Sequence, residues 1–252
     1  LQALKIEDLK ACYQNRMFRQ SAFLMVAGRF DADEMIQLLE TSFGKISLTP
    51  ETEESLASKL PPTTHTGGFE YPLDNCLQTS LRLGHPSIAR KHPDFHALRL
   101  ATTIFGGYFG SRLMKNIRED KGFTYGIGAG IVSLKHGGYF VISTDVGNEF
   151  VEATLTEIHS EIRKLQEELV SPEELQVAKN YLLGRLISDQ ESAFQIGEIY
   201  KTMILNELPF EDAEKAFRIT ESVTAEEIKQ LCQTHLRIPD FITIVSGKRL
   251  EA

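Results

Sequence analysis

The sequence predicts an α+β fold of two layers, in which an antiparallel-rich sheet is covered by helices. The first observation is the order of the expected segments: two strands, two helices, two strands, several helices and a last strand. The second is a hairpin signal, because Gly137 and Gly138 separate two strand-like runs and glycine suits the turn positions. The third is an internal repeat, which indicates that the fold unit occurs twice.

The strands are predicted by short apolar runs, some of which alternate with polar residues. In CLQTSLRLG, residues 76–84, Gln78 and Ser80 alternate with Leu77, Thr79 and Leu81. The other expected strands are FEYPL at 69–73, FTYGIGAGIVSLK at 123–135, GYFVISTDV at 138–146 and FITIVSG at 241–247.

The helices are predicted by apolar faces and by residues that suit helix ends. Pro93 suits a first helical turn, and FHALRLATTIF supplies an apolar face directly after it. Further helices are expected over residues 111–119, 149–168, 172–190, 193–206, 210–217 and 225–235.

The repeat joins the two ends of the chain. Residues 7–29 align without a gap to residues 226–248, and each reads as a helix with an acidic first turn followed by an apolar strand that ends at glycine. Residues 1–48 are therefore expected to be the tail of a preceding copy, with a strand over 21–27 and a helix from Asp31 to Phe43. The polar stretch 49–68, with Pro61-Pro62, is expected to be a linker, and 69–252 the second α+β domain.

This arrangement carries two expectations about the rest of the protein. The chain starts at Leu1, and most of the first copy is expected to lie upstream, so no compartment is assigned from a targeting signal. The apolar strand at 21–27 would lack neighbouring strands, and an unpaired apolar strand favours pairing with another molecule. A homodimer is one expected outcome.

Composition excludes several classes of function. A hydrophobic content of 42% and a charged content of 25% are those of a globular protein, and no run is long enough to span a membrane. The net charge of −8 argues against nucleic acid as the main partner. Cys12, Cys76 and Cys232 form no disulfide or zinc pattern, and we interpret them as partly buried free thiols.

Known catalytic motifs are absent from the sequence. His92 and His96 have helical i, i+4 spacing, but Pro93 lies between them and no glutamate follows as in H-E-x-x-H, so no metal site is predicted. The glycine-rich GGYFGSRL contains no Gly-Lys pair of a phosphate loop, and no G-x-S-x-G nucleophile motif occurs.

Arg118 and Tyr125 are the candidate binding residues. Gly122 lies between them and allows a tight reversal between a helix and a strand, which would bring the two side chains together. A guanidinium can donate to a peptide carbonyl, and a phenol can donate to a developing oxyanion. The alternatives stay open here: Arg118 also suits a helix C-terminus, and Tyr125 could be a core residue.

These residues carry a resemblance to a known family. The segments IFGGYFGSRL and REDKGFTYGIGA, the R-x-x-x-x-x-x-Y spacing of Arg118 and Tyr125, and the VAG and VSG strand ends resemble the C-terminal, non-catalytic half of the pitrilysin/insulinase zinc peptidases. That family includes the mitochondrial processing peptidases and similar bacterial proteins. The resemblance extends over essentially the whole chain.

The resemblance implies a role in substrate binding. Members of the family have two similar halves that close around an extended peptide, and the first half carries the zinc motif H-x-x-E-H. By resemblance, Arg118 would hold the peptide backbone and Tyr125 would donate to the carbonyl oxygen. This chain lacks H-x-x-E-H and is expected to hold no zinc and to be inactive alone, with zinc in an N-terminal catalytic half or a homologous catalytic subunit.

Two alternatives to substrate binding remain. Some members of the family have lost catalysis and serve as scaffolds or partner subunits of an active peptidase. A helix-covered sheet that binds a protein partner, without a link to proteolysis, is the other.

Overall fold

The computed structural model describes residues 3–14, 23–46, 66–135 and 137–247. The chain divides into two compact units. The first comprises residues 1–62 together with 192–201, and the second comprises residues 63–191 together with 202–252. Residues 49–65 of the predicted linker, which is 49–68, lie outside the described residues.

Helices α1 and α2 belong to the first unit. Helix α1 covers Ile6–Cys12 and helix α2 covers Ala32–Phe43. Asp31 caps α2, because its Oδ1 accepts hydrogen bonds from the backbone N–H groups of Asp33 and Glu34, each at 3.0 Å. The helix predicted from Asp31 to Phe43 is confirmed.

The strand predicted over residues 21–27 is not formed over residues 23–27, the part of it that the structure describes. Residues 23–27 have no regular secondary structure, and Phe23 and Leu24 are 43% and 59% exposed. A strand needs a hydrogen-bonded neighbour, and none of the described strands pairs with this segment. Met25 instead lies against Gly197 of helix α7, which covers Ala193–Leu205. Self-association through residues 21–27 stays a prediction.

The second unit contains a five-stranded sheet with the order β1-β5-β2-β4-β3. Strands β1 and β5 are parallel, and the remaining neighbours are antiparallel. The strands are β1 (Gly67–Pro72), β2 (Gln78–Ser87), β3 (Thr124–Leu134), β4 (Gly137–Gly147) and β5 (Ile242–Gly247). The predicted antiparallel-rich sheet is confirmed.

The register of the sheet follows the alternation in the sequence. In β2, Thr79, Leu81 and Leu83 are fully buried, whereas Arg82 points to the opposite face. Strands β3 and β4 form the predicted hairpin, in which Leu134 pairs with Gly137. One face of the sheet therefore faces the core.

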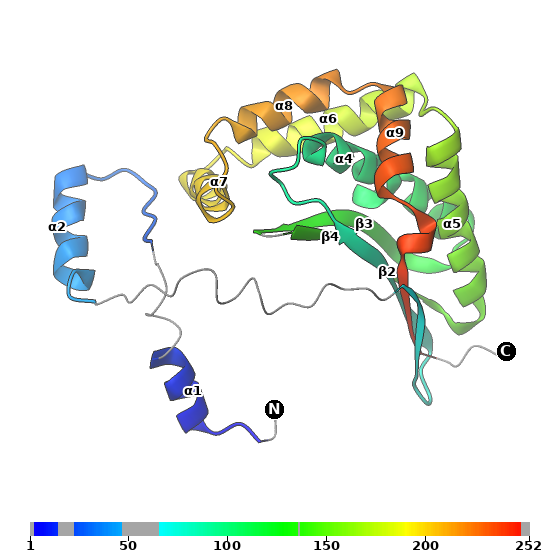
Figure 1. Ribbon diagram of the computed structural model, residues 1–252, viewed down its shortest axis with the longest axis horizontal. Coiled ribbons are helices and arrows are strands. Elements are labelled where there is room, and N and C mark those ends of the chain that lie inside the picture. The colour runs from blue at the N-terminus through cyan, green and yellow to red at the C-terminus, as the bar shows by residue number, and fades with distance from the viewer. Residues whose placement is uncertain (1–2, 15–22, 47–65, 136, 248–252) are drawn as a thin grey trace. The chain divides into compact units, whose positions relative to one another are not determined.

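Helices of the second unit lie on that side of the sheet, as Figure 1 shows for α4, α5, α6, α8 and α9; α4 and α5 pack on its strands, and α8 packs on α4 and α6. Their bounds are α4 (Phe95–Thr102), α5 (Val151–Glu167), α6 (Pro172–Ser188), α8 (Asp212–Ser222) and α9 (Ala225–His235). Pro172 opens α6 after the capping residue Ser171, and Thr224 with Glu227 forms a capping box at α9. The helix predicted over 210–217 runs instead from Asp212 to Ser222.

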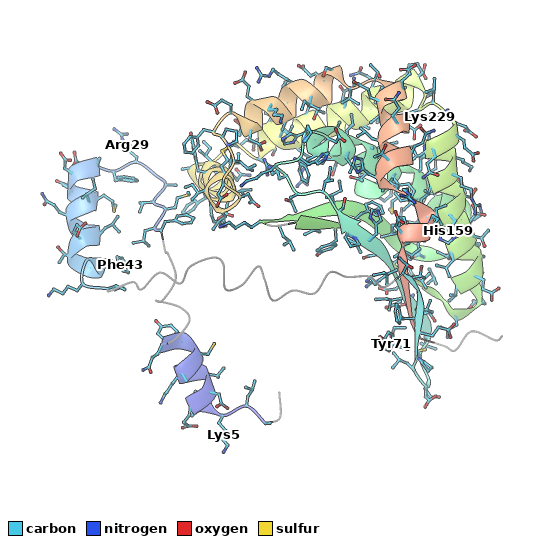
Figure 2. All side chains as sticks on the ribbon, viewed as in Figure 1. Lys5, Arg29, Phe43, Tyr71, His159 and Lys229 are labelled. Atoms are coloured by element: carbon cyan, nitrogen blue, oxygen red, sulfur yellow. The ribbon has the colours of Figure 1, made fainter. Side chains whose placement is uncertain are left out.

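The core lies between the sheet and these helices. Its buried side chains include Leu81, Leu83, Phe140 and Ile142 from the sheet and Leu98, Ile158, Ile162 and Ile228 from the helices. Burial of each such side chain stabilises the fold by about 2 kcal/mol. At the rim, Lys229 of α9 donates to the backbone carbonyl of Glu167 at 2.6 Å and so fastens α9 to the end of α5 (Figure 2).

Candidate functional site

Arg118 lies near the end of a π-helix, η3, which covers Met114–Asp120. The sequence predicts an α-helix over 111–119, and this prediction is wrong for residues 114–120, which form the wider π-helical turns. The Lys121 N–H accordingly donates to the backbone carbonyl of Asn116, five residues back, at 3.2 Å. Ile117 is fully buried, and the next side chain, that of Arg118, is 34% exposed. The helix therefore fixes its inner side in the core and holds the arginine at the surface.

Gly122 reverses the chain between η3 and β3. Its φ of +66° lies in the left-handed region, which glycine adopts without a steric cost from Cβ. The Phe123 N–H donates to the Ile117 carbonyl at 3.0 Å and closes the turn. The predicted tight reversal is confirmed, and it brings the first residues of β3 beside the end of η3.

Arg118 and Tyr125 are brought together at this turn. The Arg118 Nε donates to the backbone carbonyl of Tyr125 at 2.9 Å, while the Tyr125 side chain is 92% exposed. Tyr125 is therefore not a core residue, and that interpretation is wrong. The concave surface expected around the pair stays a prediction.

The side chains of Arg118 and Tyr125 both keep hydrogen-bond donors that face solvent. Arg118 Nη1 lies 4.0 Å from Glu119 Oε1, and no described residue accepts a hydrogen bond from the Arg118 Nη groups or from the Tyr125 hydroxyl. A guanidinium and a phenol that face solvent can both donate to carbonyl oxygens. The backbone contact of Nε holds the guanidinium in place, which lowers the entropy lost on binding.

The glycine-rich loop, residues 106–110, adds a residue that the sequence analysis missed. The Phe109 ring is 61% exposed, and its centroid lies 4.5 Å from the Arg118 guanidinium carbon, a cation–π distance. The signal available in the sequence was an aromatic pair between glycines, Tyr108-Phe109 in GGYFG. That pattern does not say which ring faces solvent.

Tyr108 is the inward ring of this loop. It stacks on Tyr181 of α6 with ring centroids 4.9 Å apart, and burial raises the pKa of its phenol. A Cβ at Gly110 would lie 2.9 Å from the Tyr108 ring, so glycine is required for this packing. Arg112 continues the attachment to α6 through paired hydrogen bonds to Glu174, both at 2.8 Å.

A polar network fastens η3 to α5. The Asn116 amide donates to Glu157 at 2.9 Å and to Glu161 at 2.8 Å, and its carbonyl oxygen accepts from Lys121 at 2.7 Å. The hydrogen bonds from Lys121 and Asn116 lower the pKa of Glu157. Because Asn116 precedes Arg118 by two residues, this network sets the position of the arginine.

The histidines of the sequence analysis have structural partners. His96 is 2% exposed and lies 3.0 Å from Asp212, which also accepts from Arg90 at 2.8 Å. The His92 Nδ1 accepts from the Asp94 N–H at 3.2 Å. In the parts of the chain that the structure describes, no group of three His, Cys, Asp or Glu side chains could hold a metal ion.

Among the described residues, no helix is long and apolar enough to cross a membrane.

Comparison with protein families gives one match that covers most of the chain. The family model described as the peptidase M16 inactive domain matches residues 3–182. An uncharacterized zinc protease of Rickettsia felis is 29% identical over 181 residues, which are 71% of this chain and 42% of the relative. A non-peptidase homolog of Helicobacter pylori is 22% identical over 99% of this chain and 57% of its own length. The chain thus spans about half the length of these relatives.

Solved structures agree with this match. The M16 inactive domain from Pseudomonas fluorescens is 30% identical, with a TM-score of 0.66 over 73% of this chain and 44% of that chain. A protease from Helicobacter pylori has a TM-score of 0.82 over 98% of this chain and 59% of that chain, at 17% identity. The second likeness shows the fold alone, and both confirm the predicted α+β architecture.

Proposed function

Because this chain belongs to the peptidase M16 inactive-domain family, we propose that it is the non-catalytic half of a zinc-dependent endopeptidase and binds the peptide substrate. Its partner would be an N-terminal catalytic half or a homologous catalytic subunit that carries the zinc. The family match and the zinc-protease relatives support this proposal. The observation that carries it is the exposed Arg118–Tyr125 pair, held in place by the Nε contact and with its other donors free.

In this proposal the two residues act on the same peptide at different stages. The Arg118 Nη groups donate to a backbone carbonyl of the bound peptide and hold the chain extended. The Tyr125 hydroxyl donates to the carbonyl oxygen at which negative charge develops. A donor used mainly in the transition state raises kcat more than it strengthens ground-state binding.

The second candidate is a scaffold or partner subunit. The Helicobacter pylori relative is described as a non-peptidase homolog, and a Bacillus subtilis relative, 22% identical over 230 residues, as a probable inactive metalloprotease. If the chain is a scaffold, Arg118 and Tyr125 would contact another subunit or would have no binding role. An intact H-x-x-E-H in the catalytic partner favours the peptidase, and its loss favours the scaffold.

Peptide binding by the 252-residue chain tests the proposal. Short extended peptides labelled with a fluorophore are titrated with the wild type, with Arg118→Ala and with the control Arg218→Ala, whose side chain is exposed on α8. Loss of a hydrogen bond from a charged donor should weaken binding about tenfold or more for Arg118→Ala. Equal affinities for all three proteins would reject substrate binding through Arg118 and favour the scaffold.

Tyr125 is tested in the assembled enzyme. Together with its catalytic half, Tyr125→Phe should lower kcat more than it raises KM, whereas the control Tyr71→Phe, on the exposed strand β1, should change neither. Unchanged kcat for Tyr125→Phe would remove the hydroxyl from the mechanism.

A further inference from the structure

Phe109 is presented to solvent by the way its loop is anchored. Its neighbour Tyr108 packs inward on Tyr181, and Gly110 leaves room for that packing. On the other side of the loop, Gly106 lies against Ala129 of β3, where a Cβ would be only 2.7 Å away. The loop is therefore held at both ends, and the exposed ring at its tip has a defined place.

The Phe109 ring lies beside Arg118, one of the two candidate binding residues. The Arg118 guanidinium packs on Phe109 and also donates to the Tyr125 carbonyl, so it joins both aromatic residues. Phe109 remains 61% exposed in spite of this contact. A large apolar surface beside free hydrogen-bond donors matches the mixed character of a peptide, which has polar backbone groups and apolar side chains.

We propose that Phe109 determines which peptides bind, by packing against a large apolar or aromatic side chain next to the carbonyl that Arg118 holds. This inference rests on the proposed function and names its substrate class. The carboxylates of Glu119 and Asp120, both exposed beside Arg118, oppose an acidic side chain at this position. An apolar side chain gains burial against the ring and carries no charge.

The test measures the preference of the full 252-residue chain for one side chain. Labelled peptides of Gly, Ser and Ala differ only at a central position, which holds Phe, Leu, Ala or Glu, and their affinities are compared by fluorescence anisotropy. The wild type should bind the Phe and Leu peptides about threefold or more tightly than the Ala peptide, the factor expected from one added apolar contact.

Substitutions at Phe109 should remove this preference without removing binding. Phe109→Ala should bind the Phe, Leu and Ala peptides equally, whereas Phe109→Leu should keep part of the preference. Phe194→Ala, which removes a ring that is 80% exposed on α7, is the matched control and should behave as the wild type. Circular dichroism of each variant shows whether the fold is kept.

The outcomes separate this inference from the proposed function. If binding depends on Arg118 but Phe109→Ala keeps the preference for Phe and Leu, the inference is wrong and the proposed function stands. If Phe109→Ala changes only the affinity for the catalytic half, the ring is a subunit contact and the inference is also wrong. If the wild type binds none of the peptides, the proposed function fails together with the inference.

Discussion

Replacement of Asn116 by alanine tests the link between the fold and the candidate site. The substitution removes two hydrogen bonds to carboxylates, at 2.9 and 2.8 Å, and the acceptor for Lys121. It leaves Glu161, which is 5% exposed, with Lys164 as its remaining hydrogen-bond donor among the described side chains. A hydrogen bond to a charged group contributes about 1.5–3 kcal/mol, so a loss of about 3 kcal/mol is expected after allowance for Glu157, whose side chain is 25% exposed.

Two measurements follow from this value. For a chain of this size, about 3 kcal/mol corresponds to a decrease in Tm of about 6–12 °C, which is measured by thermal and urea unfolding. Peptide binding should weaken at temperatures where Asn116→Ala is still folded, because η3 is no longer fastened to α5 and Arg118 loses its defined place. Asn180→Ala, at an exposed position of α6, is the control and should shift Tm by no more than about 1 °C.

A second substitution at Asn116 separates the contribution of its hydrogen bonds from that of its packing. Asn116→Asp keeps the shape of the side chain but places a carboxylate beside Glu157 and Glu161, so it should be less stable than Asn116→Ala at neutral pH. If Asn116→Ala unfolds at the wild-type temperature, or if Asn116→Asp is as stable as the wild type, the network does not hold η3 and the reasoning is wrong.

Two further predictions concern buried groups. Burial alone would raise the pKa of Asp212, but the hydrogen bond from His96 and the charge of Arg90 leave it lowered. The stabilisation of the folded state by ionised Asp212 is present above the ordinary pKa of 3.8 and is lost as pH falls below it. Asp212→Asn should therefore lower the free energy of unfolding in urea by about 3 kcal/mol at pH 7 and by much less at low pH. A loss that does not depend on pH would refute this reasoning. Burial raises the pKa of Cys232 to about 12, so its thiol should be unreactive in the folded chain. Iodoacetamide at pH 8 should modify the exposed Cys12 and leave Cys232 unmodified until urea unfolds the chain. Equal labelling of the two cysteines in the folded protein, measured by mass spectrometry of the peptides, would contradict this prediction.

Much of the fold was predictable because its signals are local. The capping residues and apolar positions of α9 give the predicted range, residues 225–235, as the structure has it. The alternation in β2 and the glycines of the β3–β4 hairpin predict the strands for the same reason. The strand prediction is wrong for residues 23–27, because a strand depends on neighbouring strands, which an apolar run does not supply.

The candidate site was predictable only in part. Arg118, Gly122 and Tyr125 are close in sequence, so their contact could be inferred from the turn between them. Phe109 could not be assigned, since the choice between Tyr108 and Phe109 as the exposed ring is made by Tyr181 on α6. The attachment of Asn116 to α5 and the π-helical turn likewise depend on hydrogen bonds that hydrophobic periodicity does not report.

The parallel pairing of β1 with β5 has a consequence for the order of folding. Gly67 pairs with Ile242, so this edge of the sheet joins residues from the two ends of the second unit. During synthesis β1 emerges before the other strands, but it must wait for β5, the last strand, to be made, by which time the β3–β4 hairpin and the helices that follow it have already emerged. Contacts between such distant residues carry a large entropic cost and form slowly. The edge strand β1 is therefore the last piece of the sheet to acquire its partner, and until then it is the part of the unit most open to pairing with another chain.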